Sequence, residues 1–226
     1  MCGRFTITIT IGYAERFSVG CGVVPDTPRY NVAPGQPVPV IVRTNEGNEA
    51  IPMEWGLVPS WARETPVARP FINARAESLL SKPAFRGPVR YRRCLVPATG
   101  FYEWARTGKS RTPFYFRRKD NALFAFAGLY ERWSPGAGDG RAGFAIVTTA
   151  PNELIRGIHD RMPAILTKGD EEEWLAPGVP TDEDCRRLLA PYPASAMESY
   201  RVSPAVNNPS AEGELLVKPA DSGSWF

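Results

Sequence analysis

The stretch that decides the fold is residues 94–133, CLVPATGFYEWARTGKSRTPFYFRRKDNALFAFAGLYERW. It alternates apolar and aromatic runs with two turn signals, Thr107–Lys109 and Asp120–Asn121. Gly, Asn and Asp favour turns because they tolerate left-handed backbone or hydrogen-bond their own main chain. The pattern predicts strands at its apolar runs, 94–96, 100–105, 113–118 and 123–133.

Further strand signals lie on both sides of this centre. We predict strands at 38–43, 51–58 and 143–149, and the alternation T-I-T-I-T-I at 6–11 predicts a half-buried strand. The stretch 134–140 is the best candidate for a flexible hairpin tip. Many short strands therefore indicate an α+β fold that is mainly antiparallel sheet.

Helix signals are short. We expect helices at 13–19, 75–80 and 182–190, and another that Asp170 would cap and that would end at Leu175. Asp182 is the expected cap of the 182–190 helix, and Asn152 is the expected cap of a short helix up to Gly157.

The chain shows no internal repeat and no long linker. We therefore predict one domain over residues 1–218 and a flexible tail at 219–226.

Composition argues against a metal site and a membrane segment. The four cysteines, Cys2, Cys21, Cys94 and Cys185, are scattered, and His159 is the single histidine. Structural zinc needs four closely spaced Cys or His ligands, so we expect no metal and free thiols. The chain has no apolar run of about 18 residues and no signal-peptide core, which predicts a cytoplasmic protein.

Charge is unevenly distributed although the net charge is only +3. Residues 61–119 hold 11 Arg and 3 Lys against 3 Glu, a local surplus of 11 + 3 − 3 = +11. Residues 170–184 hold 7 acids and no base. The basic segment either attracts a polyanion or forms a solvated face paired with the acidic segment, and the sequence leaves both interpretations open.

Cys2 is the first candidate for chemistry. Removal of Met1, expected because residue 2 is small, would leave an α-amine with a pKa of about 7.7–8.0 beside a thiol with a pKa of about 8.5. An amine condenses with an aldehyde to a Schiff base, and the neighbouring thiol can close onto the imine carbon as a thiazolidine. The alternative is that Cys2 is an ordinary small residue at a frayed terminus.

Two acid–base candidates stand in polar or aromatic contexts. His159, in GIHDRMP, is either a proton-transfer group or a satisfied structural histidine. Glu103, in GFYEW, is either partly desolvated on a central strand, with a raised pKa, or a solvent-facing strand residue.

Other residues suggest positioning and DNA contacts. Asn73 orients the nucleophile, caps a helix, or does both, and Arg75 could hold a phosphate. Trp61 and Pro34 either form an apolar wedge that parts stacked bases or, in the case of Trp61, belong to the core.

Taken together, these segments resemble the SOS-response-associated peptidase (SRAP) family, whose members process abasic sites in single-stranded DNA. The pieces that carry the resemblance, in order along the chain, are MCGRF at 1–5, YNVAP at 30–34, WG at 55–56 with Pro59 and Trp61, INARAE at 72–77, GFYEW at 100–104, TTA at 148–150, IHDRMP at 158–163, VS at 202–203 and VN at 206–207.

The resemblance implies a fold and a site. The fold would be a single β-rich domain with twisted sheets in a barrel-like arrangement and short flanking helices. The Cys2 nucleophile would be completed by Asn73, Glu103 and His159. The product would be a thiazolidine crosslink that shields the abasic site, with weak lyase and self-processing peptidase activities beside it. DNA contacts would come from Arg4, Asn31, Pro34, Trp61, Arg75, Thr149 and Arg161.

It also implies a partner and a setting. The partner would be single-stranded DNA with an abasic site, bound by a monomer without cofactor or membrane contact, in the cytoplasm and at the nucleoid on damage. Ala62 stands where some relatives carry a second aromatic residue, which weakens the expected wedge. Two rival functions stay open: an N-terminal-nucleophile amidotransferase, and a single-strand binder that ignores the aldehyde.

Overall fold

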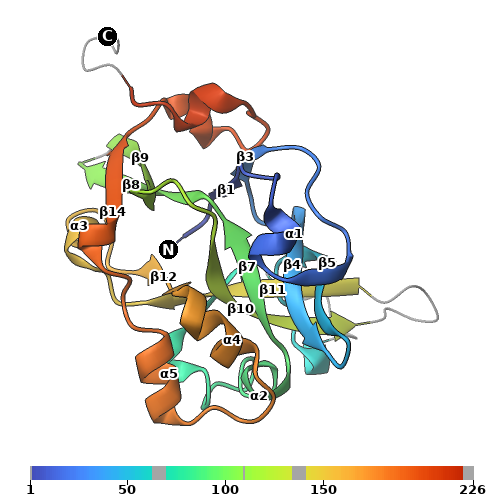
Figure 1. The fold of residues 1–226 in the computed structure, drawn as a ribbon. Helices are drawn as coiled ribbons and strands as arrows, with labels where there is room; N and C mark the ends of the chain where they lie inside the picture. The colour runs from blue at the N-terminus through green and yellow to red at the C-terminus, as the bar shows by residue number, and fades with distance from the viewer. Residues whose placement is uncertain (1, 63–69, 109, 134–140, 221–226) are drawn as a thin grey trace.

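The computed structural model describes residues 2–62, 70–108, 110–133 and 141–220. These residues form a five-stranded sheet and a nine-stranded sheet packed against each other (Figure 1). The smaller sheet has the order β14–β9–β8–β1–β3, and its neighbouring strands are antiparallel. Its strands are β1 (Phe5–Ile7), β3 (Arg29–Val32), β8 (Gly100–Thr107), β9 (Ser110–Arg118) and β14 (Met197–Arg201).

The larger sheet curls into a ring. Its main path is β12–β11–β10–β7–β4–β5–β2, and a parallel pairing of β11 with β5 joins the path back on itself. Two of the links are short: β4 pairs β7 at Ile41–Leu95, and β11 pairs β5 at only two positions. The ring is therefore not a true barrel. Its strands are β2 (Val19–Gly22), β4 (Pro37–Thr44), β5 (Gly47–Trp55), β6 (Asn73–Arg75), β7 (Arg93–Ala98), β10 (Phe124–Trp133), β11 (Arg141–Thr149), β12 (Met162–Pro163) and β13 (Ile165–Leu166).

The helices are short and lie around the sheets (Figure 1). They are α1 (Tyr13–Arg16), α2 (Pro88–Tyr91), α3 (Glu153–Arg156), α4 (Lys168–Leu175) and α5 (Asp182–Leu188), with 3-10 turns η1 (Ser60–Ala62), η2 (Ala76–Ser78), η3 (Ala194–Ala196), η4 (Pro204–Asn207) and η5 (Glu214–Val217). The predicted fold class, a β-rich α+β domain with a barrel-like sheet, is confirmed. No helix in the described ranges is long and apolar enough to cross a membrane.

The smaller sheet is covered on both faces. On one face Phe5 and Phe101 pack against Phe126 of the ring, at centroid distances of 5.9 and 6.0 Å. On the other face Tyr102 and Tyr115 pack in a second cluster of buried residues that comes from the C-terminal segment: Val202, Val206 and Leu216. The smaller sheet is thus the middle layer of the molecule, which matters because the N-terminus leads into it.

Several local predictions are corrected. The alternating stretch 6–11 does not form a half-buried strand, because β1 is buried on both faces and ends at Ile7. Beyond it, the Thr8 amide and hydroxyl both hydrogen-bond Thr99 Oγ1, at 3.0 Å each. The predicted helix at 75–80 is only the turn η2, with Asn73 in strand β6.

Two of the predicted caps are also shifted. Asp170 does not cap α4, because the Thr167 side chain accepts from the Asp170 amide instead. Thr181, not Asp182, caps α5, through a capping box with Asp184. The predicted cap of α3 is confirmed, because the Asn152 side chain accepts from the first turn of that helix. The predicted hairpin tip 134–140 and the end of the predicted tail, 221–226, lie outside the described residues.

Gly100 offers a test of the packing between β8 and β9. A Cβ at Gly100 would lie 2.3 Å from the Tyr115 ring and 2.7 Å from the Phe116 carbonyl oxygen, both buried. We expect Gly100→Ala to lower the free energy of unfolding by about 1–3 kcal/mol, measured by urea denaturation. Gly20→Ala is the matched control, because a Cβ there meets nothing within 4 Å. Equal stability of the two variants would contradict this packing.

Candidate active site

Cys2 lies three residues before the start of β1 and is fully buried. Its thiol lies 3.7 Å from the Arg4 carbonyl oxygen, to which it donates. Burial raises the pKa of the Cys2 thiol far above its usual range, and the Glu103 carboxylate raises this pKa further. The thiol is therefore protonated at neutral pH in this state, unlike the partly ionised thiol that the sequence alone predicts. The interpretation of Cys2 as a frayed terminal residue is wrong.

Asn73 reaches Cys2 from a distant part of the chain. Strand β6 runs parallel to β11, with Asn73 opposite Ile146. Its amide Nδ2 donates to the Cys2 carbonyl oxygen at 3.0 Å. Its Oδ1 is buried and has no hydrogen-bond partner among the described residues. Asn73 is thus a strand residue that hydrogen-bonds to Cys2 rather than a helix cap.

Glu103 lies on β8, the middle strand of the smaller sheet. It is 3% exposed, so the solvent-facing alternative is wrong. Burial raises the pKa of the Glu103 carboxyl, while the charge of His159 acts in the opposite direction. The predicted desolvation is confirmed. A carboxyl with a raised pKa can hold a proton closer to neutral pH and can act as an acid as well as a base.

His159 follows α3, whose last turn it closes by donating its amide to the Ile155 carbonyl oxygen at 2.9 Å. Its Nδ1 accepts from the Arg161 amide at 3.0 Å and lies 2.8 Å from Asp160 Oδ1. These two contacts need different protonation states, because Nδ1 without a proton accepts from the amide and Nδ1 with a proton faces the carboxylate. The imidazole thus has a partner in either state, which suits a group that exchanges protons.

An ion pair holds the His159 turn in place. Arg161 donates to both carboxylate oxygens of Glu77, at 2.6 and 3.0 Å, and also to the Thr148 carbonyl oxygen. The hydrogen bond from Arg161 keeps the pKa of the Glu77 carboxyl below its ordinary value. Glu77 follows β6 by two residues, so this pair ties the His159 turn to the strand that carries Asn73.

Glu77 was missed by the sequence reasoning, although it lies in the INARAE motif. A carboxylate four positions after Asn73 gives no sequence signal of its partner, which lies 84 residues further along the chain. Arg161 was predicted as a DNA contact, and the structure places its guanidinium mainly against protein groups. The remaining role of Arg161 toward DNA stays a prediction.

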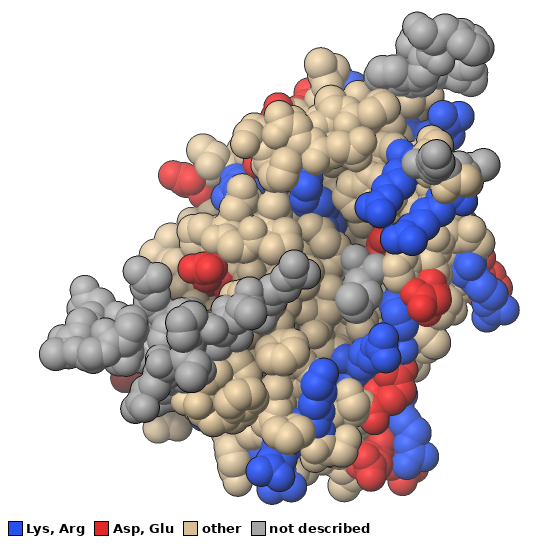
Figure 2. Space-filling model, turned by 180° about the vertical axis from the view of Figure 1, so that it is seen from behind, with Lys and Arg blue, Asp and Glu red and all other residues tan. Residues whose placement is uncertain are grey.

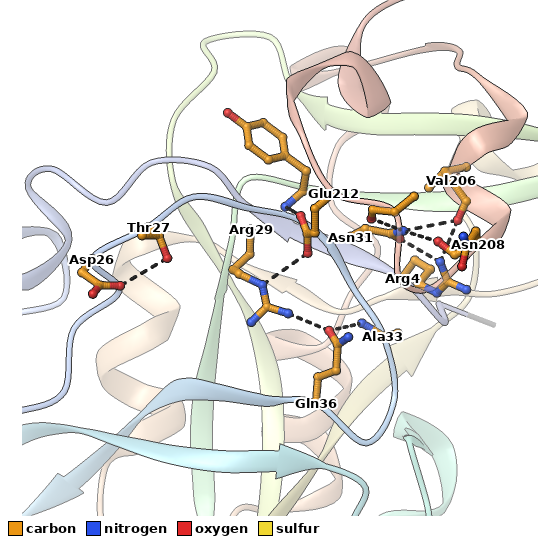
Figure 3. A network of polar contacts seen from close by, with 12 residues as sticks. Arg4, Asp26, Thr27, Arg29, Asn31, Ala33, Gln36, Val206, Asn208 and Glu212 are labelled. Atoms are coloured by element: carbon orange, nitrogen blue, oxygen red, sulfur yellow. Dashed lines mark hydrogen bonds and ion pairs between the residues drawn. The ribbon is translucent and has the colours of Figure 1, made fainter.

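Arg4 and Asn31 form a polar network with the C-terminal segment (Figure 3). Arg4 Nη1 donates to Asn31 Oδ1 and to the Val206 carbonyl oxygen, at 2.7 Å each. Asn31 Nδ2 donates to the carbonyl oxygens of Asn208 and Ala211, at 2.9 Å each. Both side chains therefore attach this segment to the sheet next to Cys2. Asn31 is fully buried, and Arg4 keeps part of its guanidinium at the surface.

The other predicted DNA contacts differ in exposure. Pro34, Trp61 and Arg75 are exposed, whereas Thr149 is buried at the end of β11. The core-tryptophan alternative for Trp61 is wrong, because 69% of its surface is exposed. Among the described residues, no group of three or more His, Cys, Asp or Glu side chains could hold a metal ion.

Fold and site together define a class: β-rich two-sheet proteins with a buried Cys2, held by an asparagine, beside a buried carboxyl and a histidine. A family model, SOS response associated peptidase (SRAP), matches residues 1–209. The chain belongs to this family, which confirms the resemblance found in the sequence.

Individual relatives extend the match over nearly the whole chain. Abasic site processing protein YoqW of Bacillus subtilis is 42% identical over 223 residues, covering 96% of this chain and 99% of the relative. Abasic site processing protein YedK of Escherichia coli is 31% identical, covering 84% of each. A crystal structure of a protein from Bacteroides thetaiotaomicron superposes with a TM-score of 0.86 at 30% identity, covering 97% of this chain and 100% of the other.

The buried charge of Glu103 should cost stability in a pH-dependent way. Because its folded-state pKa is raised, the stability that it contributes is full below the unfolded pKa of about 4.3 and is lost as pH rises through the folded pKa. We expect Glu103→Gln to raise the melting temperature at pH 7 by at least about 2 °C. This difference should shrink toward zero below about pH 4. A difference that does not change with pH would contradict a raised pKa.

The tautomer of His159 can be measured directly, because the chain has one histidine. Since Nδ1 accepts from the Arg161 amide, the neutral ring should carry its proton on Nε2. We expect long-range ¹H–¹⁵N spectra to show one histidine with the Nε2–H pattern at high pH. A dominant Nδ1–H pattern would mean that the turn held by Arg161 and Glu77 does not determine the tautomer of the His159 ring.

Proposed function

We propose that this protein captures abasic sites in single-stranded DNA as a covalent thiazolidine on Cys2, after removal of Met1. The names of the relatives, abasic site processing proteins, supply the substrate class. The observation that carries the proposal is the hydrogen bond from Asn73 to the Cys2 carbonyl oxygen. The buried Glu103 carboxyl acts electrostatically on the Cys2 thiol, and His159 acts electrostatically on Glu103. This arrangement holds an N-terminal residue in one place, which a nucleophile needs.

The first step makes a carbon–nitrogen bond. Removal of Met1 turns the Cys2 amide into a free α-amine, and the amine attacks C1′ of the open-chain sugar aldehyde. The carbonyl oxygen takes up one proton from the amine and a second from an acid, the carbon–oxygen bond breaks and water leaves, which gives a protonated imine. The buried Oδ1 of Asn73 is suited to accept a hydrogen bond from the amine and so to aim its lone pair.

The second step closes the ring. The Cys2 sulfur adds to the carbon of the protonated imine, the π electrons move to nitrogen, which keeps its remaining proton, and the thiol proton goes to the Glu103 carboxylate. Overall, an aldehyde and a cysteine give a thiazolidine and one water, with no oxidation or reduction. Because burial raises the thiol pKa, the sulfur needs a base at this point, and Glu103 is the carboxylate whose charge acts on it.

Glu103 and His159 divide the proton transfers. Protonated Glu103 delivers the proton to the departing oxygen, and the resulting carboxylate then takes the proton of the thiol. His159, with a partner in each protonation state, assists opening of the sugar ring. Two groups of different environment can thus serve one reaction as acid and base.

A branch at the imine accounts for lyase activity. An imine at C1′ acidifies the neighbouring carbon and permits β-elimination of the 3′ phosphate. Ring closure by sulfur removes the imine and prevents this strand break. The balance between the stable crosslink and cleavage therefore depends on the Cys2 thiol.

Cys2→Ala is the direct test. This variant retains an α-amine after removal of Met1 but has no sulfur at its first residue, so the heat-stable crosslink to an abasic single strand should fall to background on a denaturing gel. A residual imine, trapped by borohydride, and some strand cleavage are expected. Cys21→Ala is the control, because Cys21 is a free and exposed cysteine, and it should crosslink like the unmodified protein.

Two results would contradict the proposal. One is an unchanged heat-stable crosslink in Cys2→Ala. The other is no crosslink from unmodified protein whose mass shows that Met1 is gone. In the second case, glutamine hydrolysis would be assayed as the rival activity of an N-terminal cysteine.

A further inference from the structure

Among the described residues, no salt bridge joins the basic segment 61–119 to the acidic side chains of 170–184. In the described ranges, the acids of the second segment pair with arginines that lie elsewhere: Glu171 with Arg16, Glu172 with Arg43, and Glu173 and Asp170 with Arg187. Ion pairs of the basic segment go to other acids, namely Arg92 to Glu131, Arg117 to Glu198 and Arg118 to Asp120. The salt bridges of the described residues therefore do not support the interpretation of a face paired with the acidic segment.

Part of this unneutralised charge lies around two exposed aromatic rings. Trp61 on η1 is 69% exposed, and Tyr91 at the end of α2 is 72% exposed. Both line a surface hollow of about 400 Å³ together with Arg86, Arg90 and Arg92. We call these five residues the Trp61–Tyr91 surface. Figure 2, the view from behind, shows Lys and Arg side chains along one side of the molecule, with Asp and Glu side chains among them.

The local fold explains why these side chains point outward. α2 begins with Pro88, which is favoured at a first helical position, and buries Pro88 and Val89 against the core. Arg90 and Tyr91 are then left on the exposed side. Glu131 at the hollow is already neutralised by Arg92 at 2.9 Å, whereas the ion pairs seen in the described ranges include none for Arg86 or Arg90. The surface has a net positive charge.

The surface is joined to the active site through the backbone. Trp61 lies in the segment that connects β5 to β6. An antiparallel β-bridge between Leu57 and Phe71 joins the two ends of this segment. Asn73, two residues after Phe71, binds Cys2. Phe71 also packs edge-on against Phe85, at a centroid distance of 5.4 Å, beside Arg86. The Trp61–Tyr91 surface is thus linked to Cys2 through Phe71 and Asn73.

We propose that the Trp61–Tyr91 surface binds a single-stranded flank of the DNA, beyond the abasic nucleotide. Unpaired bases stack on Trp61 and Tyr91, and Arg86 and Arg90 contact the phosphates between them. Exposed aromatic rings interleaved with cations are the usual means of holding single strands without sequence preference. A duplex hides its base faces and would use the arginines alone. This assignment rests on the proposed function for the identity of the strand.

The test is a triple variant, Arg86→Gln/Arg90→Gln/Tyr91→Ala, beside Lys168→Gln/Arg201→Gln. Each removes two positive charges, and the control residues are exposed on α4 and β14. For undamaged single-stranded DNA we expect the triple variant to lose about tenfold or more in affinity, by fluorescence anisotropy. Its log–log salt slope should fall by about 1.4, or ~0.7 for each lost phosphate contact. The control should change much less.

Crosslinking gives the second readout. Abasic strands would carry a long flank on the 5′ side, a long flank on the 3′ side, or short flanks on both sides. With subsaturating unmodified protein, one long flank should raise the crosslinking rate, and the triple variant should lose that gain. On the strand with short flanks the triple variant should match the unmodified protein.

The outcomes separate the two proposals. A triple variant that keeps its affinity, its salt slope and its gain from the long flank would overturn the assignment and would point to a protein partner. Equal losses in the variant and the control would also overturn it, since bulk charge would then suffice. Absence of any crosslink from unmodified protein would overturn the proposed function, whereas the affinity for undamaged strands would still decide the role of the surface.

Discussion

The structure depends on the burial of its first strand between two sheets. Phe5 of β1 packs edge-on against Trp55 and Phe126 of the ring, at centroid distances of 5.1 and 5.9 Å. Burying one such ring contributes about 1.5–3 kcal/mol. Pairing of β1 with both β3 and β8 adds backbone hydrogen bonds on each side. A chain end normally frays, but β1 is hydrogen-bonded to a neighbouring strand on each edge and is packed on both faces.

This constraint explains why the site can be built on a terminus. Cys2 is only three residues from Phe5, so little backbone freedom remains for it. Asn73 from β6 and Glu103 from β8 reach the same place because each strand is hydrogen-bonded into a sheet that packs against the other. Preorganised groups need little rearrangement during reaction, and here the sheets supply that order.

Burial also determines the electrostatics of the site. It raises the pKa of both the Cys2 thiol and the Glu103 carboxyl, and the negative charge of the second raises the pKa of the first. Burial therefore shifts both groups toward their protonated forms. Two positive groups have structural contacts: Arg4 binds the C-terminal segment, and Arg161 holds the His159 turn through Glu77. Arg86 and Arg90, for which the ion pairs of the described residues show no partner, lie at the Trp61–Tyr91 surface.

The sequence by itself determined the fold class, most strands of the centre, and the four residues Cys2, Asn73, Glu103 and His159 as candidates. Strand and turn signals are local, and motif residues keep their order along the chain, so both can be recognised without coordinates. It could not determine that the strand expected at 6–11 is only the short buried β1, which ends at Ile7, or that Asn73 lies in β6 rather than at a helix cap. Those outcomes depend on pairing with β8 and β11, far away in sequence. Only the tertiary structure showed Arg161 bound to Glu77 and the acidic segment paired away from the basic one, because ion pairs follow distances in space rather than spacing along the chain.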